Sequence, residues 1–462
     1  MTLILTQDLT LSPGEVRTYD QGNFIFATAV QVGWFEGVVG EVYFEPTVIN
    51  HGEMHLGTTT SGGADFFRFA GSLAWDYGIF RNYGLISAVA LDDLDVRALF
   101  APNRSPPTYN AGRIVAKAKI TAIGYEGWDQ GVVVTNAASG YVFAESAERS
   151  LAIYLPNGGT IVNEGRLRAH SAGGAGHDLV PNHAHTVSFG GFSVSRSTLT
   201  NSGLIEATDS DAAADLAVAV MCYEGHILNS GTLRGDYAIR AAPNAGDLSH
   251  EKIIVENSGL IEGKVMLGSG EDSIRNTNRI VGDVDLSGGD DIYDGELGTV
   301  TGTVRGSDGN DHLKGGAGAD LLDGGHGADR LFGGGGDDQL TGGGSRDVMN
   351  GGGGADVFVF TASSHSTFAL RSDGRKTLPD LLEEFVSGQD KIDLSAIDAV
   401  VGSGDDAFTF VGSSAFTGRA GELRVEIRNE YAFISGDMNG DGIADLIIVA
   451  QTQIIQVGDF IL

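Results

Sequence analysis

The chain has 462 residues, a formal net charge of −32 at neutral pH, 42% hydrophobic residues, 70 glycines and one cysteine. The length allows two or three domains, and the hydrophobic content is adequate for packed cores. The acidic charge argues against nucleic acid or an anionic membrane as a partner. A single cysteine excludes an intramolecular disulfide framework, and the apolar residues before Cys222 predict a core position for it.

The start of the chain, residues 1–45, is rich in aromatic residues and lacks the repeat that follows it. Because a repeat domain needs a cap over its first exposed coil, we expect a β-rich cap here. The first residues have no basic region and no long apolar core, so no secretory signal peptide is predicted. We also expect no membrane span, since no stretch approaches the ~20 apolar residues that a spanning helix needs.

Residues 46–267 carry a loose repeat, apolar-x-N-x-G-x-apolar, with a period of about 28 residues. Short β-rich runs separate the copies and helix signals are few, which predicts a right-handed parallel β-helix with three short strands per coil. We expect stacked asparagine side chains to hydrogen bond along the coils, a structural role. The anchors are Asn50, Asn82, Asn110, Asn163, Asn201, Asn229 and Asn257, with degenerate copies at Asn136 and Asn276.

The coil from Asn163 to Asn201 is the longest and holds several of the 11 histidines. His177, His183 and His185 are candidates for acid–base residues or metal ligands. Histidines on a surface loop without a role are the other reading, so no catalytic residue is assigned.

Residues 268–360 form the next predicted domain, a calcium-binding parallel β-roll. Two partial turns, at residues 268–274 and 289–293, precede six nine-residue units that run without a gap from Gly306 to Val359. The units match G-G-x-G-x-D-x-U-x, where U is a large apolar residue, which is a calcium-binding signature. A flexible glycine-rich linker would have no reason to keep aspartate and leucine in phase.

The chemistry follows from the spacing of the units. Glycines at positions one, two and four allow a tight turn with positive φ and leave backbone carbonyls accessible. Ca²⁺ takes about six to eight oxygen ligands, so two stacked turns with their aspartates can complete one site. We expect two units per coil, with each ion between a unit and the second unit after it, and roughly four full sites.

The candidate ligands are the residues at positions one, three and six of each unit. They are Gly306, Asp308, Asp311, Gly315, Ala317, Asp320, Gly324, His326, Asp329, Gly333, Gly335, Asp338, Gly342, Gly344, Asp347, Gly351, Gly353 and Asp356. Acidic residues far outnumber basic ones between residues 268 and 360. Without cations these carboxylates repel one another, so we expect several calcium ions to drive folding.

The last predicted domain, residues 361–462, is a β-rich cap with one helix signal at residues 378–385. The string at residues 437–445 reads D-x-N-x-D-G-x-x-D, like the first nine positions of an EF-hand loop, but position twelve is Ile448. Two readings stay open, a calcium-binding hairpin loop and a plain polar turn. The candidate ligands are Asp437, Asn439, Asp441 and Asp445.

These repeats resemble those of RTX (repeats-in-toxin) proteins, which Gram-negative bacteria secrete through type I export. Residues 355–360, 385–395 and 459–462 resemble the C-terminal domain of serralysin-type secreted proteases. The resemblance covers residues 268–462 and implies calcium binding, an export signal at the C-terminus, the type I secretion machinery as a partner, and an extracellular or cell-surface location. The zinc motif H-E-x-x-H of those proteases is absent from the sequence, so metalloprotease activity is not expected.

Two functions remain open for the β-helix. The first is a structural or adhesive role without catalysis, in which a cell-surface or matrix polysaccharide is the candidate partner. The second is a carbohydrate-active enzyme, a polysaccharide lyase or epimerase, that carries a calcium-dependent export module. The regular Asn–Gly coils favour the first, and the long coil with its histidines favours the second.

Overall fold

The computed structural model is almost entirely β-strand, and its described residues contain two short 3-10 turns and no α-helix. The all-β, stacked parallel fold predicted from the repeats is confirmed. No helix of the described residues is long and apolar enough to cross a membrane. The structure describes residues 2–5, 17–19, 23–26, 31–32, 42–44, 47–50, 53–58, 64–65, 79–90, 96–101, 107–118, 121–127, 132–146, 149–171, 183–189, 197–210, 217–242, 252–366, 378–402, 404 and 406–462.

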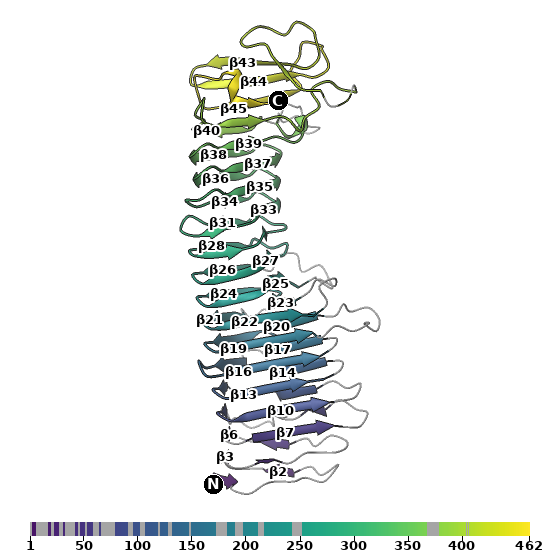
Figure 1. Cartoon of the computed structure of the whole chain (residues 1–462), viewed down its shortest axis with the longest axis vertical. Coiled ribbons are helices and arrows are strands. Elements are labelled where there is room, and N and C mark those ends of the chain that lie inside the picture. Colours follow the sequence, from purple (N-terminus) through teal and green to yellow (C-terminus); the bar gives the residue numbers. More distant parts are fainter. Residues whose placement is uncertain are drawn as a thin grey trace. The chain divides into compact units, whose positions relative to one another are not determined.

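The chain divides into two compact units. The first unit comprises residues 1–247 and 253–266, and the second unit comprises residues 248–252 and 267–462. In each unit successive strands lie side by side as stacked rungs (Figure 1).

The first unit contains three ladders of parallel strands. In the first ladder each strand from β6 onward ends at an asparagine of the repeat. Its strands are β1 (Thr2–Leu5), β3 (Asn23–Phe26), β6 (Thr47–Asn50), β9 (Ile79–Asn82), β12 (Thr108–Asn110), β15 (Val132–Asn136), β18 (Gly159–Asn163), β21 (Thr198–Asn201), β24 (Gly225–Asn229) and β26 (Ile253–Asn257).

The second and third ladders complete each coil, which gives the three strands per coil that the repeat predicted. The second ladder is β4 (Gln31–Val32), β7 (Glu53–Thr58), β10 (Leu85–Ala90), β13 (Arg113–Lys117), β16 (Tyr141–Ser146), β19 (Arg166–Ser171), β22 (Leu204–Asp209), β25 (Thr232–Ala241) and β27 (Leu260–Met266). The third is β8 (Ala64–Asp65), β11 (Val96–Ala101), β14 (Thr121–Gly127), β17 (Arg149–Leu155), β20 (His183–Phe189), β23 (Ala217–Cys222) and the end of β25. A separate pair joins β2 (Arg17–Tyr19) to β5 (Val42–Phe44).

The asparagines of the first unit form one continuous ladder of buried side chains, which we call the Asn ladder. Each Nδ2 donates a hydrogen bond to Oδ1 of the asparagine one coil later, at 2.7–2.8 Å. The predicted structural role of these residues is therefore confirmed, and Asn136 is a full member. The ladder contains Asn82, Asn110, Asn136, Asn163, Asn201, Asn229 and Asn257. Cys222 is buried, as predicted.

The second unit is built from two ladders of short parallel strands on opposite sides of a roll. One is β28 (Ser273–Asn276), β31 (Ile292–Asp294), β34 (His312–Lys314), β36 (Arg330–Gly335), β38 (Val348–Gly353) and β40 (Leu381–Glu383). The other is β30 (Val284–Asp285), β33 (Thr303–Asp308), β35 (Leu321–His326), β37 (Gln339–Gly344), β39 (Val357–Val359), β41 (Lys391–Asp393) and β46 (Phe460–Ile461), and β29 (Arg279–Val281) pairs with β32 (Thr299–Val300).

Each nine-residue unit thus pairs with the second unit after it, as the spacing predicted. Leu313 pairs with Leu331 on one side of the roll, and Leu322 pairs with Leu340 on the other. The apolar residue at position eight is fully or almost fully buried in all six units. The core of the roll is therefore made of one side chain per unit.

The end of the second unit is an antiparallel meander next to β40, and one prediction there is wrong. The meander consists of β43 (Glu422–Arg428), β44 (Tyr431–Asp437) and β45 (Leu446–Ala450), with β42 (Thr409–Phe410) beside it. Residues 378–385 contain the strand β40 and no helix, because β38 and β45 pair with the two edges of that strand. Ladder pairing outweighs the helix preference of a segment this short. The 3-10 turns are η1 (Ser363–His365) and η2 (Val457–Asp459).

Candidate metal centres in the second unit

Two columns of buried aspartates, which we call the Asp columns, run through the second unit. In both, Oδ1 of an aspartate accepts a hydrogen bond from the backbone N–H of the aspartate one coil earlier, at 2.6–3.1 Å. One column contains Asp272, Asp291, Asp311, Asp329, Asp347 and Asp380. The other contains Asp320, Asp338, Asp356 and Asp390.

The second carboxylate oxygen, Oδ2, is buried and accepts no hydrogen bond at most positions of the two columns. At Asp272, Asp320 and Asp390 it accepts a backbone N–H, at 3.2, 2.6 and 2.8 Å respectively. A buried ionised oxygen without a donor is costly, so it calls for a proton or a cation. The unpaired Oδ2 atoms belong to Asp291, Asp311, Asp329, Asp338, Asp347, Asp356 and Asp380.

The glycine at position one of each unit lies against the Oδ2 atom of the same unit. A Cβ added to Gly324 would lie 2.5 Å from Oδ2 of Asp329 and 2.6 Å from the carbonyl oxygen of Gly342, one coil later. Gly306, Gly315, Gly333 and Gly351 meet their own aspartates in the same way. Carboxylate and carbonyl oxygens from two coils therefore converge beside this glycine, and the absence of a side chain keeps the space open.

Glycines at positions two and four supply the turn, and Gly327 at position four has φ of 132°. Gly325 has φ of 100° and Gly343 has φ of 94°, a region that residues with a side chain rarely adopt. The prediction that position one also needs positive φ is wrong, because those glycines are required for space and not for backbone conformation.

The carbonyl groups at position three form part of the same turns. Those of His326 and Gly344 accept the N–H of Gly309 and Gly327, at 2.8 and 3.0 Å. A carbonyl oxygen has two lone pairs, so each keeps one for a further partner. No group of three or more His, Cys, Asp or Glu side chains within the described ranges is arranged to hold a metal.

The electrostatics of the columns oppose ionisation of the carboxyl groups. Burial, followed by repulsion from Asp347 and Asp311, raises the pKa of Asp329 to about 8. Burial likewise raises the pKa of Asp338 to about 7 and that of Asp380 to about 9. At neutral pH these groups favour a bound proton, or a cation that takes its place.

The hairpin loop between β44 and β45 contains the four candidate ligands, of which Asn439 and Asp445 are in contact. Asp437 accepts the N–H groups of Gly440 and Gly442, at 2.7 and 2.9 Å, through its two oxygens. Asp445 accepts the N–H of Met438 at 2.8 Å and the side-chain amide of Asn439 at 3.2 Å. Oδ1 of Asp441 accepts a further backbone N–H. These bonds are compatible with both readings of the loop, a polar turn and a cation site.

The histidine candidates lie on or near β20 of the first unit. His185 is buried in that strand, between Leu151 and Val218 of the neighbouring strands. His183 begins the strand, but its side chain lies outside the described residues, as does the whole of His177. The structure therefore does not bring these three side chains into one described site.

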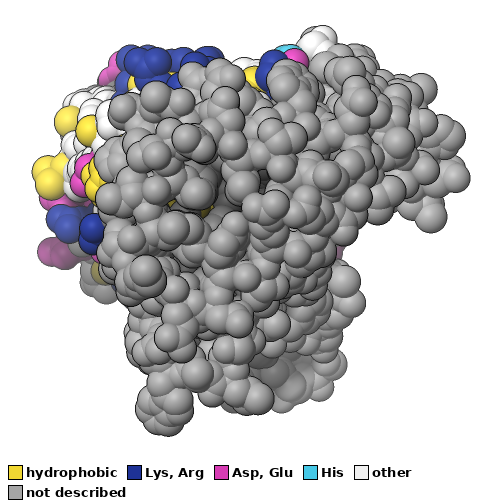
Figure 2. All heavy atoms as spheres, turned by 90° about the horizontal axis from the view of Figure 1, so that it is seen from below, with side chains coloured by type: hydrophobic (Ala, Val, Ile, Leu, Met, Phe, Trp, Pro, Cys, Tyr) yellow, Lys and Arg dark blue, Asp and Glu magenta, His cyan; other side chains and the backbone are white. Residues whose placement is uncertain are grey.

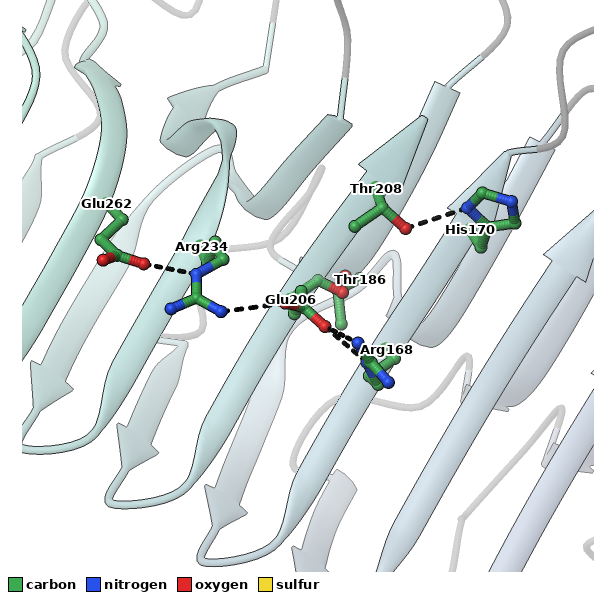
Figure 3. A network of polar contacts seen from close by, with 7 residues as sticks. All are labelled: Arg168, His170, Thr186, Glu206, Thr208, Arg234 and Glu262. Atoms are coloured by element: carbon green, nitrogen blue, oxygen red, sulfur yellow. Dashed lines mark hydrogen bonds and ion pairs between the residues drawn. The ribbon is translucent and has the colours of Figure 1, made fainter. Parts of the chain in front are cut away.

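An ion-pair ladder crosses four coils on the outward face of the first unit, where sequence reasoning found none (Figure 3). Glu206 pairs with Arg168 on one side and with Arg234 on the other, and Arg234 also pairs with Glu262. In the same view His170 lies 2.9 Å from the hydroxyl of Thr208. These residues are partnered with one another across adjacent strands, so the ladder supports the stack.

Four members of the Asp columns were not among the predicted ligands. Asp272 and Asp291 lie in the two partial turns before the six units. The other two are Asp380 and Asp390. They follow the last nine-residue unit, and residues 361–379 interrupt the period before them. A signal was present nonetheless, because residues 380–383 and 390–393 both keep the D-x-U-x end of the motif. Leu382 and Ile392 occupy the core position of that pattern and are fully buried.

Comparisons with known proteins include a family match to the C-terminal part of the chain. Residues 250–462 match the model of the family Peptidase M10 serralysin C terminal. The chain is 40% identical over 88 residues to the metalloprotease AprA of Pseudomonas entomophila (strain L48), which covers 19% of this chain and 18% of that protein. The segment from residue 250 to the end is therefore similar to a serralysin-type C-terminal domain.

A solved structure also resembles part of the chain. It is the solution structure of the AlgE6R3 subunit from the Azotobacter vinelandii mannuronan C5-epimerase, which is 23% identical and has a TM-score of 0.24. The match covers 33% of this chain and 77% of that one.

Proposed function

We propose that this is an exported calcium-binding protein whose second unit completes its folding when calcium occupies the Asp columns. The buried, unpaired Oδ2 atoms carry this proposal. Calcium is a hard cation that prefers carboxylate and carbonyl oxygens, and both converge beside the glycine at position one. Binding to the folded form alone would couple calcium affinity to folding.

The proposed ligands are the residues at positions one, three and six of the six units. Asp291 and Asp380 extend the first column, and each keeps an unpaired Oδ2. Asp390 extends the second. The loop at residues 437–445 offers oxygen atoms of the same kind and is proposed as a further site.

We also propose that the protein leaves a Gram-negative cell through the type I secretion machinery and functions outside it. The serralysin-type C-terminal domain supports this proposal. Near its end, Asp459 is buried and accepts hydrogen bonds from Ser387 at 2.6 Å and from Gly388 and Gln456 at 2.8 Å. Removal of residues 459–462 is expected to reduce export, and normal secretion of that truncated chain would count against the export route.

For the first unit we propose a structural or adhesive role rather than catalysis. Two polar features of its described ranges, the Asn ladder and the ion-pair ladder, connect neighbouring coils. His185 is buried against apolar neighbours, which makes it a poor acid–base residue for an external substrate. The alternative, a polysaccharide lyase or epimerase, depends on His177 and on the side chain of His183, outside the described part.

The test uses the full chain, freed of metal by chelation and then titrated with calcium. Circular dichroism and isothermal titration calorimetry should show a gain of β-structure together with the binding of several ions. Magnesium should do far less, since it demands a small octahedral site and retains its water. A spectrum unchanged by chelation and by calcium would reject the proposal.

A further inference from the structure

Three adjacent strands of the first unit, β13, β16 and β19, present a cationic and aromatic surface. Arg113, Tyr141 and Arg166 lie in one register column, each directly opposite the next. Both arginines are exposed, and Tyr141 is half-buried. Leu85 and Leu204 occupy the same column on the strands to either side, so the polar part of the column spans three coils. We call Arg113, Tyr141, Phe143 and Arg166 the cationic face.

The charges of the cationic face are not neutralised by neighbours. Lys117 is paired with Glu145 at 2.6 Å, and Arg168 is paired with Glu206. Arg113 and Arg166, by contrast, form no ion pair within the described residues. Two uncompensated guanidinium groups on one column are unexpected in a chain whose net charge is −32. In the space-filling view, Lys and Arg side chains gather beside hydrophobic ones on the described part of the surface (Figure 2).

The two aromatic side chains of β16, which we call the platform, stack on one another, and Tyr141 lies between the two arginines. The rings of Tyr141 and Phe143 are nearly parallel, with centroids 5.9 Å apart and 10° between their planes. The guanidinium of Arg113 lies 5.7 Å from the centre of the Tyr141 ring, which holds it near the platform. An aromatic face beside charged donors suits a ligand that has both flat apolar faces and anionic groups.

We propose that the cationic face binds a carboxylated polysaccharide, a 1,4-linked uronan that runs along the stack of coils. Arg113 and Arg166 are two strand spacings apart, ~9.6 Å. In an extended two-fold uronan every second sugar turns its carboxylate to the same side. Alternate carboxylates would each meet one arginine, and the sugar between them would lie on Tyr141.

This inference names the partner of the proposed adhesive role, and it rests on that role. The net charge of the chain favours a uronan over nucleic acid as the anionic ligand. Nucleic acid has a dense, regular array of charges that a protein of net charge −32 repels. A uronan has one charge per sugar and offers sugar rings that can stack on the platform. Its recognition therefore depends on short-range contacts with the cationic face.

The experiment measures binding of hexagalacturonate and hexamannuronate to the full calcium-loaded chain by isothermal titration calorimetry, with cellohexaose as the neutral probe. Both uronate hexamers should bind, and cellohexaose should bind at least ~10-fold more weakly. The double variant R113Q/R166Q should lose at least ~10-fold in affinity for the uronates, and Tyr141→Ala should also weaken binding. Absence of binding by both hexamers overturns the proposal, as does tighter binding of a single-stranded oligonucleotide.

A matched control separates this site from general charge effects and from calcium bridging. Arg240 and Lys264 contact the ring of Tyr237, at 4.9 and 5.8 Å, on another part of the first unit. The variant R240Q/K264Q removes the same charge and should bind the hexamers like the unchanged chain. Equal loss in both double variants would overturn the proposal. Calcium-induced folding is followed in the same samples by circular dichroism, so failure of the calcium proposal is seen separately.

Discussion

Each unit of this chain contains buried polar side chains stacked from coil to coil, asparagines in the first unit and aspartates in the second. An asparagine carries both a donor and an acceptor, so Nδ2 of Asn136 satisfies Oδ1 of Asn163, whose own Nδ2 satisfies Asn201. An ionised aspartate carries acceptors alone. Oδ1 of Asp329 is satisfied by a backbone N–H, but its Oδ2 has no donor. The Asn ladder is complete by itself, whereas the unpaired oxygens of the Asp columns call for a proton or a cation.

A change of pH should have the largest effect, because it should alter the stability of the metal-free second unit. In the metal-free second unit, burial raises the pKa of Asp329 to about 8 and of Asp347 to about 7, above the ~3.9 of an unfolded chain. The folded form then binds more protons than the unfolded form, so its stability falls as the pH rises from about 4 to 8. Chemical denaturation of the chelated protein at pH 5 and pH 8 should show this loss. With calcium present the trend should reverse, and a metal-free roll equally stable at both pH values would contradict the account.

Interrupting the Asn ladder should have the next largest effect. Asn163→Ala removes the partner of Asn136 Nδ2 and of Asn201 Oδ1, both buried, and should cost about 2–4 kcal/mol of unfolding free energy. Urea denaturation measures this loss, which should be the same with and without calcium. Ser202→Ala, at an exposed turn position beside the ladder, is the control and should change little. If the stability loss in Asn163→Ala depended on calcium, the two units would not differ in their need for a cation.

Converting one aspartate of the columns into asparagine should have opposite effects on stability and on calcium binding. In Asp338→Asn a neutral amide replaces the unpaired carboxylate, so the metal-free roll should become more stable at pH 8. Calcium affinity should fall at least ~10-fold, about 1.4 kcal/mol. Calorimetry and denaturation of the same samples measure both effects. Glu296→Gln removes the same charge from an exposed ion pair with Lys314. It should change neither the stability of the metal-free roll nor its calcium affinity.

The sequence predicts the repeating architecture well because each coil repeats the same local requirements. Asparagine, glycine and the apolar position eight recur in phase, and the structure confirms their roles at Asn163 and Leu331. The strand at residues 381–383 could not be found in this way, because its pairing with distant β38 and β45 overrides local preference. The ion-pair ladder was hidden for a related reason: Arg168 and Glu206 are 38 residues apart, across the longest coil.

Disrupting the ion-pair ladder should have the smallest effect on the unfolding free energy. Glu206→Gln weakens the pairs with Arg168 and Arg234, whose side chains are 44% and 48% exposed, while that of Glu206 is 8% exposed. The glutamine oxygen can still accept hydrogen bonds from the two solvated guanidinium groups. Ion pairs of this kind contribute about 0–1 kcal/mol, and salt screens them. The loss of unfolding free energy should therefore be below about 1 kcal/mol and smaller still in high salt. A loss as large as that of Asn163→Ala would mean that the outward ladder, and not the buried one, holds the coils together.

The most direct measurement is hydrogen exchange of the full chain, followed segment by segment, with calcium and after chelation. The account predicts that amides of β34, β36 and β38 lose protection when calcium is removed, because the carboxylates around them then repel. Amides of β15, β18 and β21, beside the Asn ladder, should keep their protection in both conditions. Equal protection of β36 with and without calcium, or loss of protection in both units together, would contradict it.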